Sequence, residues 1–170
     1  FFLSDNGGPT RELTSSNFPL RGEKGQMYEG GLRVPFMARW KGVIPAGKVY
    51  HKPVVSYDLF ATIAANAPGV TAPKQVEGVN LIPFISGQDK GRPHKTLFWR
   101  QGGKTALRHD DWKLVRMGKR LTAGKAQWEL YDLSKDLAET NDLAQTHPER
   151  LAELVQLWKE TNATMLKPLF

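Results

Sequence analysis

Asp5 and Asn6 place a carboxylate beside a carboxamide, directly after an apolar run and before two glycines. Their side-chain oxygens are hard ligands of the kind that Ca²⁺ and Mg²⁺ prefer. Gly7 and Gly8 let the backbone turn away at once. Calcium takes about six to eight oxygens, so these two residues can form only one wall of a metal site. Taken alone, Asp-Asn-Gly is more typical of a turn.

Lys24 lies about twenty residues later, between Gly22 and Gly25, and the glycine pair at 30–31 follows it. Flanking glycines let a backbone bend closely around an anion, and an ammonium is a compact charge suited to an anion's oxygen. An exposed lysine without a function is the ordinary alternative. The order of the segments favours a site that binds both a metal and an anion.

Three segments, at 4–8, 20–25 and 28–36, resemble the second half of the sulfatase family in the alkaline phosphatase superfamily. They read Ser-Asp-Asn-Gly-Gly, Leu-Arg-Gly-Glu-Lys-Gly and Tyr-Glu-Gly-Gly-Leu-Arg-Val-Pro-Phe. Further resembling segments lie at 44–47, 56–59, 77–81, 110–115, 129–133 and 139–143. Each motif is weak alone, but their order and spacing cover most of the chain.

The resemblance implies that Asp5 and Asn6 bind the active-site cation, Ca²⁺ or alternatively Mg²⁺, and that Lys24 contacts the substrate sulfate. Sulfatases use a formylglycine nucleophile made from a Cys/Ser-x-Pro-x-Arg motif, which we expect upstream because this chain has neither that motif nor a cysteine. Its histidines inherit no catalytic role: His51, His94, His109 and His147. We interpret Glu29 and Arg33 as a structural ion pair, and Arg21 as either a support of the site or a surface residue.

We therefore expect the C-terminal fragment of a larger enzyme, because the chain opens at Phe1 inside what should be a central strand. The predicted fold class is α/β, with residues 1–93 as the C-terminal portion of an alkaline-phosphatase-like catalytic domain. Residues 94–170 are predicted to form a small α+β domain with a roughly four-stranded antiparallel sheet and a C-terminal helix. The missing N-terminal part would be its partner, and the fragment alone should be inactive.

The composition is ordinary for a soluble globular protein, with 170 residues, 40% hydrophobic and 24% charged. The formal net charge of +7 suits a sulfated small molecule or sulfated glycan. The basic residues look scattered and no aromatic-interleaved RNA motif is present, so we expect no nucleic-acid partner. No apolar run is long enough for a membrane span. The resemblance favours a periplasmic, secreted or lysosomal parent enzyme.

The first part of the chain predicts buried strands at residues 1–3 and 34–40, with a polar surface loop at 10–19 near the site. Ser56 is the expected N-cap of the following helix, and Asp58 lies in its first turn, where a negative charge favours the helix dipole. Apolar residues at helical spacing predict a core-facing stripe: Leu59, Phe60, Ile63, Ala64 and Ala67. A short helix or turn is predicted over 78–86.

The second part predicts a four-stranded meander, with strands at 96–100, 105–109, 112–116 and 128–133. The tryptophans of these strands, Trp99, Trp112 and Trp128, are expected in the core, with sugar stacking as the alternative. The basic turn at Lys119, Arg120 and Lys125 is expected to be a solvated hairpin tip rather than a polysaccharide contact.

The closing helix should start at a capping box of Thr146 and Glu149, with Pro148 in its first turn. It should cover the sheet with its apolar face: Leu151, Leu154, Val155 and Trp158.

Three alternatives to a sulfatase remain open at this stage. A phosphatase or phosphonate hydrolase of the same superfamily would share the Asp-Asn metal ligands. A non-catalytic module for sulfated glycans would need only a basic face and exposed tryptophans. A nucleic-acid binder is the least favoured, and a steeply salt-dependent affinity for DNA would be the observation in its support.

Overall fold

The computed structural model describes residues 1–12, 14–70, 73, 75–118 and 127–166. Contacts within the chain divide it into two compact units, one of Phe1 with Met37–Lys95 and one of Phe2–Phe36 with Thr96–Phe170. We describe each unit by itself. The predicted domain division at residue 93 stays a prediction, since these units group contacts within this chain alone.

The second unit is built on a four-stranded antiparallel sheet in the order β3-β4-β5-β6, as the meander predicted. Its strands are β3 (Thr96–Gln101), β4 (Lys104–His109), β5 (Trp112–Arg116) and β6 (Glu129–Asp132). The turn between β4 and β5 contains Asp110 in a left-handed conformation, with φ of 54°. Alternation along each strand sends successive side chains to opposite faces, and both faces are buried here.

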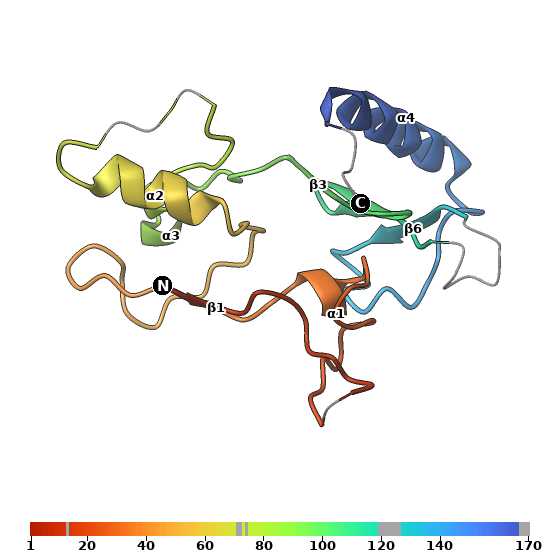
Figure 1. Cartoon of the computed structure of the whole chain (residues 1–170), viewed down its shortest axis with the longest axis horizontal. Helices are drawn as coiled ribbons and strands as arrows, with labels where there is room; N and C mark the ends of the chain where they lie inside the picture. Colours follow the sequence, from red (N-terminus) through yellow and green to blue (C-terminus); the bar gives the residue numbers. More distant parts are fainter. Residues whose placement is uncertain (13, 71–72, 74, 119–126, 167–170) are drawn as a thin grey trace. The chain divides into compact units, whose positions relative to one another are not determined.

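Helix α4 (Pro148–Thr164) covers one face of this sheet, and helix α1 (Glu29–Leu32) lies on the other side (Figure 1). Leu154 of α4 packs with Leu107, Leu114 and Leu130 of the sheet, which confirms the predicted covering face. On the opposite face, Met27 and Tyr28 pack with residues that alternate with those leucines along the strands: Ala106, Val115, Met117, Tyr131 and Leu133.

The predicted tryptophan positions are confirmed, because Trp99 packs against the Met27 face and Trp112 and Trp128 against the α4 face. The predicted capping box of α4 is wrong. His147 is the N-cap and makes no side-chain cap bond, while the Thr146 hydroxyl bonds to the Leu143 carbonyl. Pro148 does occupy the first turn, where its missing donor costs little. The basic turn at Lys119, Arg120 and Lys125 lies outside the described residues.

The first unit contains α2 (Asp58–Asn66) and α3 (Ile82–Ser86), close to the predicted ranges. Tyr57, not Ser56, is the N-cap of α2, and it makes no side-chain cap bond. The predicted apolar stripe is wrong in part. Ala64 is buried, but Phe60 and Ile63 are 54% and 56% exposed, so they lie outside the core of this unit.

The two strands predicted near the amino end are short. β1 (Phe2–Leu3) and β2 (Phe36–Met37) form a two-stranded sheet, and β2 begins directly after Pro35, which has no ladder donor. Phe1 and Phe2 are 51% and 60% exposed, so the expected burial of the first strand is not seen. Among the described helices, none has both the length and the apolar character that a membrane crossing requires.

Candidate functional site

The segments that carry the predicted site residues are joined by backbone hydrogen bonds within the second unit. The Lys24 amide donates to the Gly8 carbonyl at 3.3 Å, and the Gly7 amide donates to the Gly31 carbonyl at 3.2 Å. The Gly30 amide donates to the Arg21 carbonyl at 2.7 Å. Residues up to 24 positions apart therefore form one assembly of loops, which starts where β1 ends.

Asn17 fastens this assembly from a loop in which the sequence showed little pattern. Its Oδ1 accepts the Gly8 amide at 2.9 Å, and its Nδ2 donates to the carbonyls of Gly8 at 2.9 Å and Gly22 at 3.1 Å. One side chain thus bonds both the loop after Asp5-Asn6 and the loop before Lys24. An isolated asparagine in a polar stretch carries no sequence signal for such a role.

Glycines are required where the loops cross. A Cβ placed on Gly30 would lie 2.6 Å from the Arg21 carbonyl oxygen, and one on Gly7 would overlap the Gly30 carbonyl. Such distances are below any normal contact of a Cβ, so these positions need glycine for close backbone approach rather than for an unusual φ. The glycine pattern of the sequence therefore reflects packing of main chain against main chain.

Asp5 and Asn6 lie in the loop that follows β1, as predicted. Asp5 is exposed and Asn6 is half-buried. The Asn6 Nδ2 donates to the Gly7 carbonyl at 3.0 Å, which leaves its Oδ1 as the atom available to a cation. In the described part of the chain, no group of three or more His, Cys, Asp or Glu side chains is placed to hold a metal. The hard-oxygen chemistry fits Ca²⁺ or Mg²⁺, and the shell would need further ligands.

Lys24 is exposed, and its neighbour Glu23 is held in place. The Glu23 carboxylate accepts the Thr10 hydroxyl at 2.9 Å and the Arg11 amide at 3.0 Å, and it pairs with the Arg11 guanidinium at 2.8 Å. These bonds fix the backbone beside Lys24 while leaving its side chain in solvent. The roles of Asp5, Asn6 and Lys24 stay predictions.

A buried ion cluster holds the Glu29 end of the assembly against the sheet. Lys113 of β5 is fully buried, and its Nζ lies 2.8 Å from both Glu29 Oε1 and Glu139 Oε1. The second oxygen of Glu139 accepts the Glu29 amide at 2.5 Å. Burial raises the pKa of the Glu139 carboxyl, with Lys113 acting against that shift. The predicted ion pair between Glu29 and Arg33 is wrong. Glu29 does form a structural ion pair, but its partner is Lys113, and Arg33 bonds to the Glu29 carbonyl through its amide.

Arg21 belongs to a second network that joins the same loops to β6. Its guanidinium donates to the Tyr131 hydroxyl at 2.7 Å and to the Glu139 carbonyl at 3.1 Å, and it lies 3.9 Å from the centre of the Tyr28 ring. Both phenols donate to the Glu129 carboxylate, and burial, followed by that carboxylate, raises their pKa values. Arg21 was interpreted as either a support of the site or a surface residue, and these contacts favour the first interpretation.

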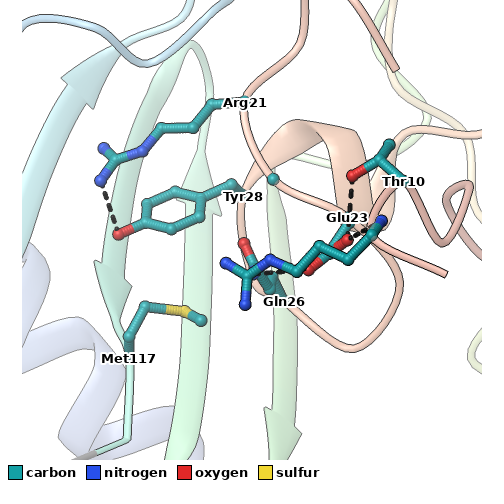
Figure 2. A pocket seen from close by; sticks show the side chains of 8 residues that line it. Thr10, Arg21, Glu23, Gln26, Tyr28 and Met117 are labelled. Atoms are coloured by element: carbon teal, nitrogen blue, oxygen red, sulfur yellow. Dashed lines mark hydrogen bonds and ion pairs between the residues drawn. The ribbon is translucent and has the colours of Figure 1, made fainter. Parts of the chain in front are cut away.

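A cavity of about 410 Å³ opens beside this network (Figure 2). Figure 2 shows Arg21 directed at the Tyr28 hydroxyl, and Thr10 and Gln26 directed at Glu23. The polar groups that line the cavity are therefore largely bonded to one another. This arrangement indicates a support of the Lys24 loop rather than a binding site.

The first unit holds a buried histidine–aspartate pair that the sequence did not predict. Asp58 is fully buried, and its two oxygens lie 2.8 and 2.9 Å from His94 Nε2. The same carboxylate accepts the amides of Val55 at 2.9 Å and Val79 at 3.0 Å. With four contacts on one carboxylate, the pair fastens two loops to the start of α2. Asp58 was expected only to favour the helix dipole.

Comparison with known proteins places these loops and the sheet in one family. The family described as N-sulphoglucosamine sulphohydrolase, C-terminal, matches residues 22–165. A sulfatase of Schizosaccharomyces pombe is 32% identical over 160 residues, which cover 89% of this chain and 28% of that protein. A sulfatase of Formosa agariphila is 33% identical over 165 residues, covering 86% of this chain and 29% of that protein.

Solved structures lead to the same group. The crystal structure of Ps i-CgsB superposes with a TM-score of 0.78 at 30% identity, over 94% of this chain and 35% of that chain. The same protein has been solved in complex with k-i-k-neocarrahexaose, a ligand of that protein. This chain therefore spans about a third or less of the length of the relatives that it matches.

Proposed function

This chain belongs to the sulfatase family, because the C-terminal family described above matches its residues 22–165. From that premise we propose that the chain supplies part of the metal and sulfate site of a sulfuric ester hydrolase. The observation that carries the proposal is the bond from the Lys24 amide to the Gly8 carbonyl. It joins the backbone at Lys24 to the loop that follows Asp5 and Asn6, which supports a shared site for these three side chains.

Asp5 and the Oδ1 of Asn6 would hold the cation, which we propose to be Ca²⁺, with Mg²⁺ as the alternative. A bound divalent cation supplies Lewis-acid chemistry by drawing charge from sulfate oxygens. Lys24 would contact a sulfate oxygen and stabilise the negative charge that develops there in the transition state. Asn17 and the Lys113 cluster would keep these groups in place, because catalysis of this kind depends on fixed donors.

The nucleophile would come from a part of the enzyme outside this sequence, as a formylglycine. The substrate class is an aryl or carbohydrate sulfate ester, and the likeness to Ps i-CgsB, solved with a carbohydrate ligand, favours the carbohydrate. We place the complete enzyme in the periplasm, outside the cell or in lysosomes. By this account the 170 residues alone do not turn over an aryl sulfate.

The test uses Lys24→Ala in the complete enzyme. Loss of one charge-stabilising donor should lower kcat by roughly a hundredfold to a thousandfold. The control is Lys135→Ala, which removes an ammonium that is 82% exposed and paired only with Asp132 at 2.9 Å. If Lys24→Ala left kcat unchanged while the control behaved normally, Lys24 would have no place in the mechanism.

The metal assignment is tested separately by calorimetry. Asp5→Ala in the complete enzyme should abolish measurable Ca²⁺ binding, because a charged oxygen ligand is lost from the shell. Intact Ca²⁺ affinity would contradict the ligand assignment. Relative rates on an aryl sulfate and the matching aryl phosphate distinguish a sulfatase from a phosphatase of the same superfamily, and a dominant phosphatase rate would overturn the proposal.

A further inference from the structure

The positive charge of this chain is concentrated in one acid-free stretch. No Asp or Glu occurs between Glu29 and Asp58, while residues 30–57 contain five basic residues: Arg33, Arg39, Lys41, Lys48 and Lys52. This stretch carries a formal charge of +5 − 0 = +5, against +7 for the whole chain. The basic residues are scattered along the chain as expected, and the net positive charge of this segment comes from its lack of acidic residues.

Part of this stretch folds around a cavity in the first unit. Residues 38–48, which we call the basic loop, line a cavity of about 720 Å³. That volume is in the range of ligand sites, roughly 300–1,000 Å³. Three cations stand on the basic loop, Arg39, Lys41 and Lys48, and all are exposed. The loop follows β2 and precedes α2 (Figure 1).

The cations of the basic loop have no opposite charge beside them. In the ranges that the structure describes, no carboxylate pairs with Arg39, Lys41 or Lys48. Carboxylates do pair with several cations elsewhere in the chain: Arg11, Arg21, Lys113 and Lys135. The Lys48 ammonium instead lies against Gly87, at the C-terminal end of α3. The positive charges of Arg39, Lys41 and Lys48 repel one another when no anion is bound. An anion that carries several negative charges would relieve this repulsion and would be attracted by all three residues.

Trp40 adds a flat apolar surface to the same loop. Its side chain is 41% exposed, and Val43 beside it is 37% exposed. A tryptophan next to cations offers one face for stacking on a sugar ring and leaves the charged groups to contact its substituents. Single-stranded nucleic acids are held on several successive aromatic side chains, whereas this loop contains one.

We propose that the basic loop is a binding site for a sulfated polysaccharide, in addition to the site residues assigned above. Trp40 stacks on one sugar ring, and Arg39, Lys41 and Lys48 bind sulfate groups on that sugar and its neighbours. The choice of a sulfated sugar as the anion rests on the proposed function. The existence of an anion site rests on the charge, the cavity and the exposed indole.

The test is calorimetric titration of the 170-residue chain with a heparin hexasaccharide and with its desulfated counterpart, at low salt and at physiological salt. Arg39→Gln/Lys41→Gln/Lys48→Gln should weaken heparin binding by about tenfold or more, because charge-assisted bonds are lost. Trp40→Ala should weaken it by roughly fivefold or more, because a stacking surface is lost. The desulfated sugar should bind at least tenfold more weakly than heparin.

The matched control is Lys95→Gln/Lys135→Gln/Lys159→Gln, which removes the same charge from exposed positions elsewhere. It should change affinity by less than about threefold. Equal losses in the two triple variants would overturn the proposal in favour of unspecific charge attraction, and tighter binding of a single-stranded DNA of equal charge would overturn it in favour of nucleic acid. The heparin titration measures no turnover, so a negative result would leave the Lys24 and Asp5 tests of the proposed function unaffected. Heparin binding that is unchanged by Lys24→Ala would support a site separate from the one that contains Lys24.

Discussion

Lys113→Met tests whether the buried ion cluster holds the Lys24 loops to the sheet. The substitution keeps the length of the side chain but removes the only ammonium described beside the carboxylates of Glu29 and Glu139, which are 5% and 0% exposed. Two buried negative charges would then face each other without compensation. Removing one partner of a buried pair costs about 3–5 kcal/mol.

A loss of that size lowers the folding equilibrium constant by roughly a hundredfold to a few thousandfold. For a chain of this length it corresponds to a fall in Tm of about 6–20 °C. The loss should also depend on pH. Without Lys113, which acts against the effect of burial, the pKa of the Glu139 carboxyl rises further in the folded state. Stability is therefore lost as pH rises from about 4.5, the ordinary value of this carboxyl, through its raised pKa. The variant should therefore lose less stability at pH 5 than at pH 7.

The assay is urea unfolding followed by circular dichroism at both pH values, with Lys135→Met as the matched control. Lys135 is 82% exposed, and its pair with Asp132 should contribute less than about 1 kcal/mol. If Lys113→Met and Lys135→Met lost the same stability at pH 7, or if the loss at Lys113 did not change with pH, the cluster would not act through its charges.

Three further substitutions test other parts of the structure. Gly30→Ala should destabilise the chain by about 1–3 kcal/mol in urea unfolding, because its Cβ would lie 2.6 Å from the Arg21 carbonyl oxygen. Gly103→Ala is the control and should cost less than about 1 kcal/mol, because the nearest atom to its Cβ among the described residues lies 3.8 Å away. Asp58→Ala should speed hydrogen exchange of the two amides bonded to its carboxylate, and unchanged exchange would contradict that role. Hydrogen bonds from neighbouring amides and a threonine hydroxyl, acting against burial, lower the pKa of Asp136. The stability they contribute is therefore lost as pH falls below about 3.8, and Asp136→Asn should remove that loss from the pH profile.

The sheet and its covering helix could be predicted because their side-chain periods are regular. In β5, Leu114 and Val115 alternate between two buried faces, and Leu154 returns on one face of α4 at helical spacing. Such local patterns persist in the fold because each strand pairs with its neighbour in the sequence. The helix caps were wrong, since Ser56 and Thr146 are one position too early for the observed N-caps.

The supports of the candidate site could not be predicted in the same way. Lys113 reads as an ordinary strand lysine, because its partners Glu29 and Glu139 lie 84 and 26 positions away. The one sequence feature that indicates burial of Lys113 is its position between Trp112 and Leu114, in a strand that is buried on both faces. Asp5 and Lys24 were proposed through a resemblance of ordered motifs, and their roles stay predictions.

Under the proposed function, the contrast between the exposed residues proposed for the site and their buried supports has a consequence for the complete enzyme. Asp5 and Lys24 are exposed, and the backbone bonds around them are few, so the loops by themselves would not hold a fixed geometry. Rigidity comes instead from Arg21 and Glu29, which bind to β5, β6 and the turn at Glu139. Because charge stabilisation in a transition state depends on fixed donors, substitutions in this sheet should alter turnover without touching substrate. In a folded Arg21→Lys enzyme we expect a lower kcat with little change in Ca²⁺ affinity, since an ammonium cannot reproduce the guanidinium's several fixed donors. An unchanged kcat would show that the sheet stabilises the fold without positioning the site.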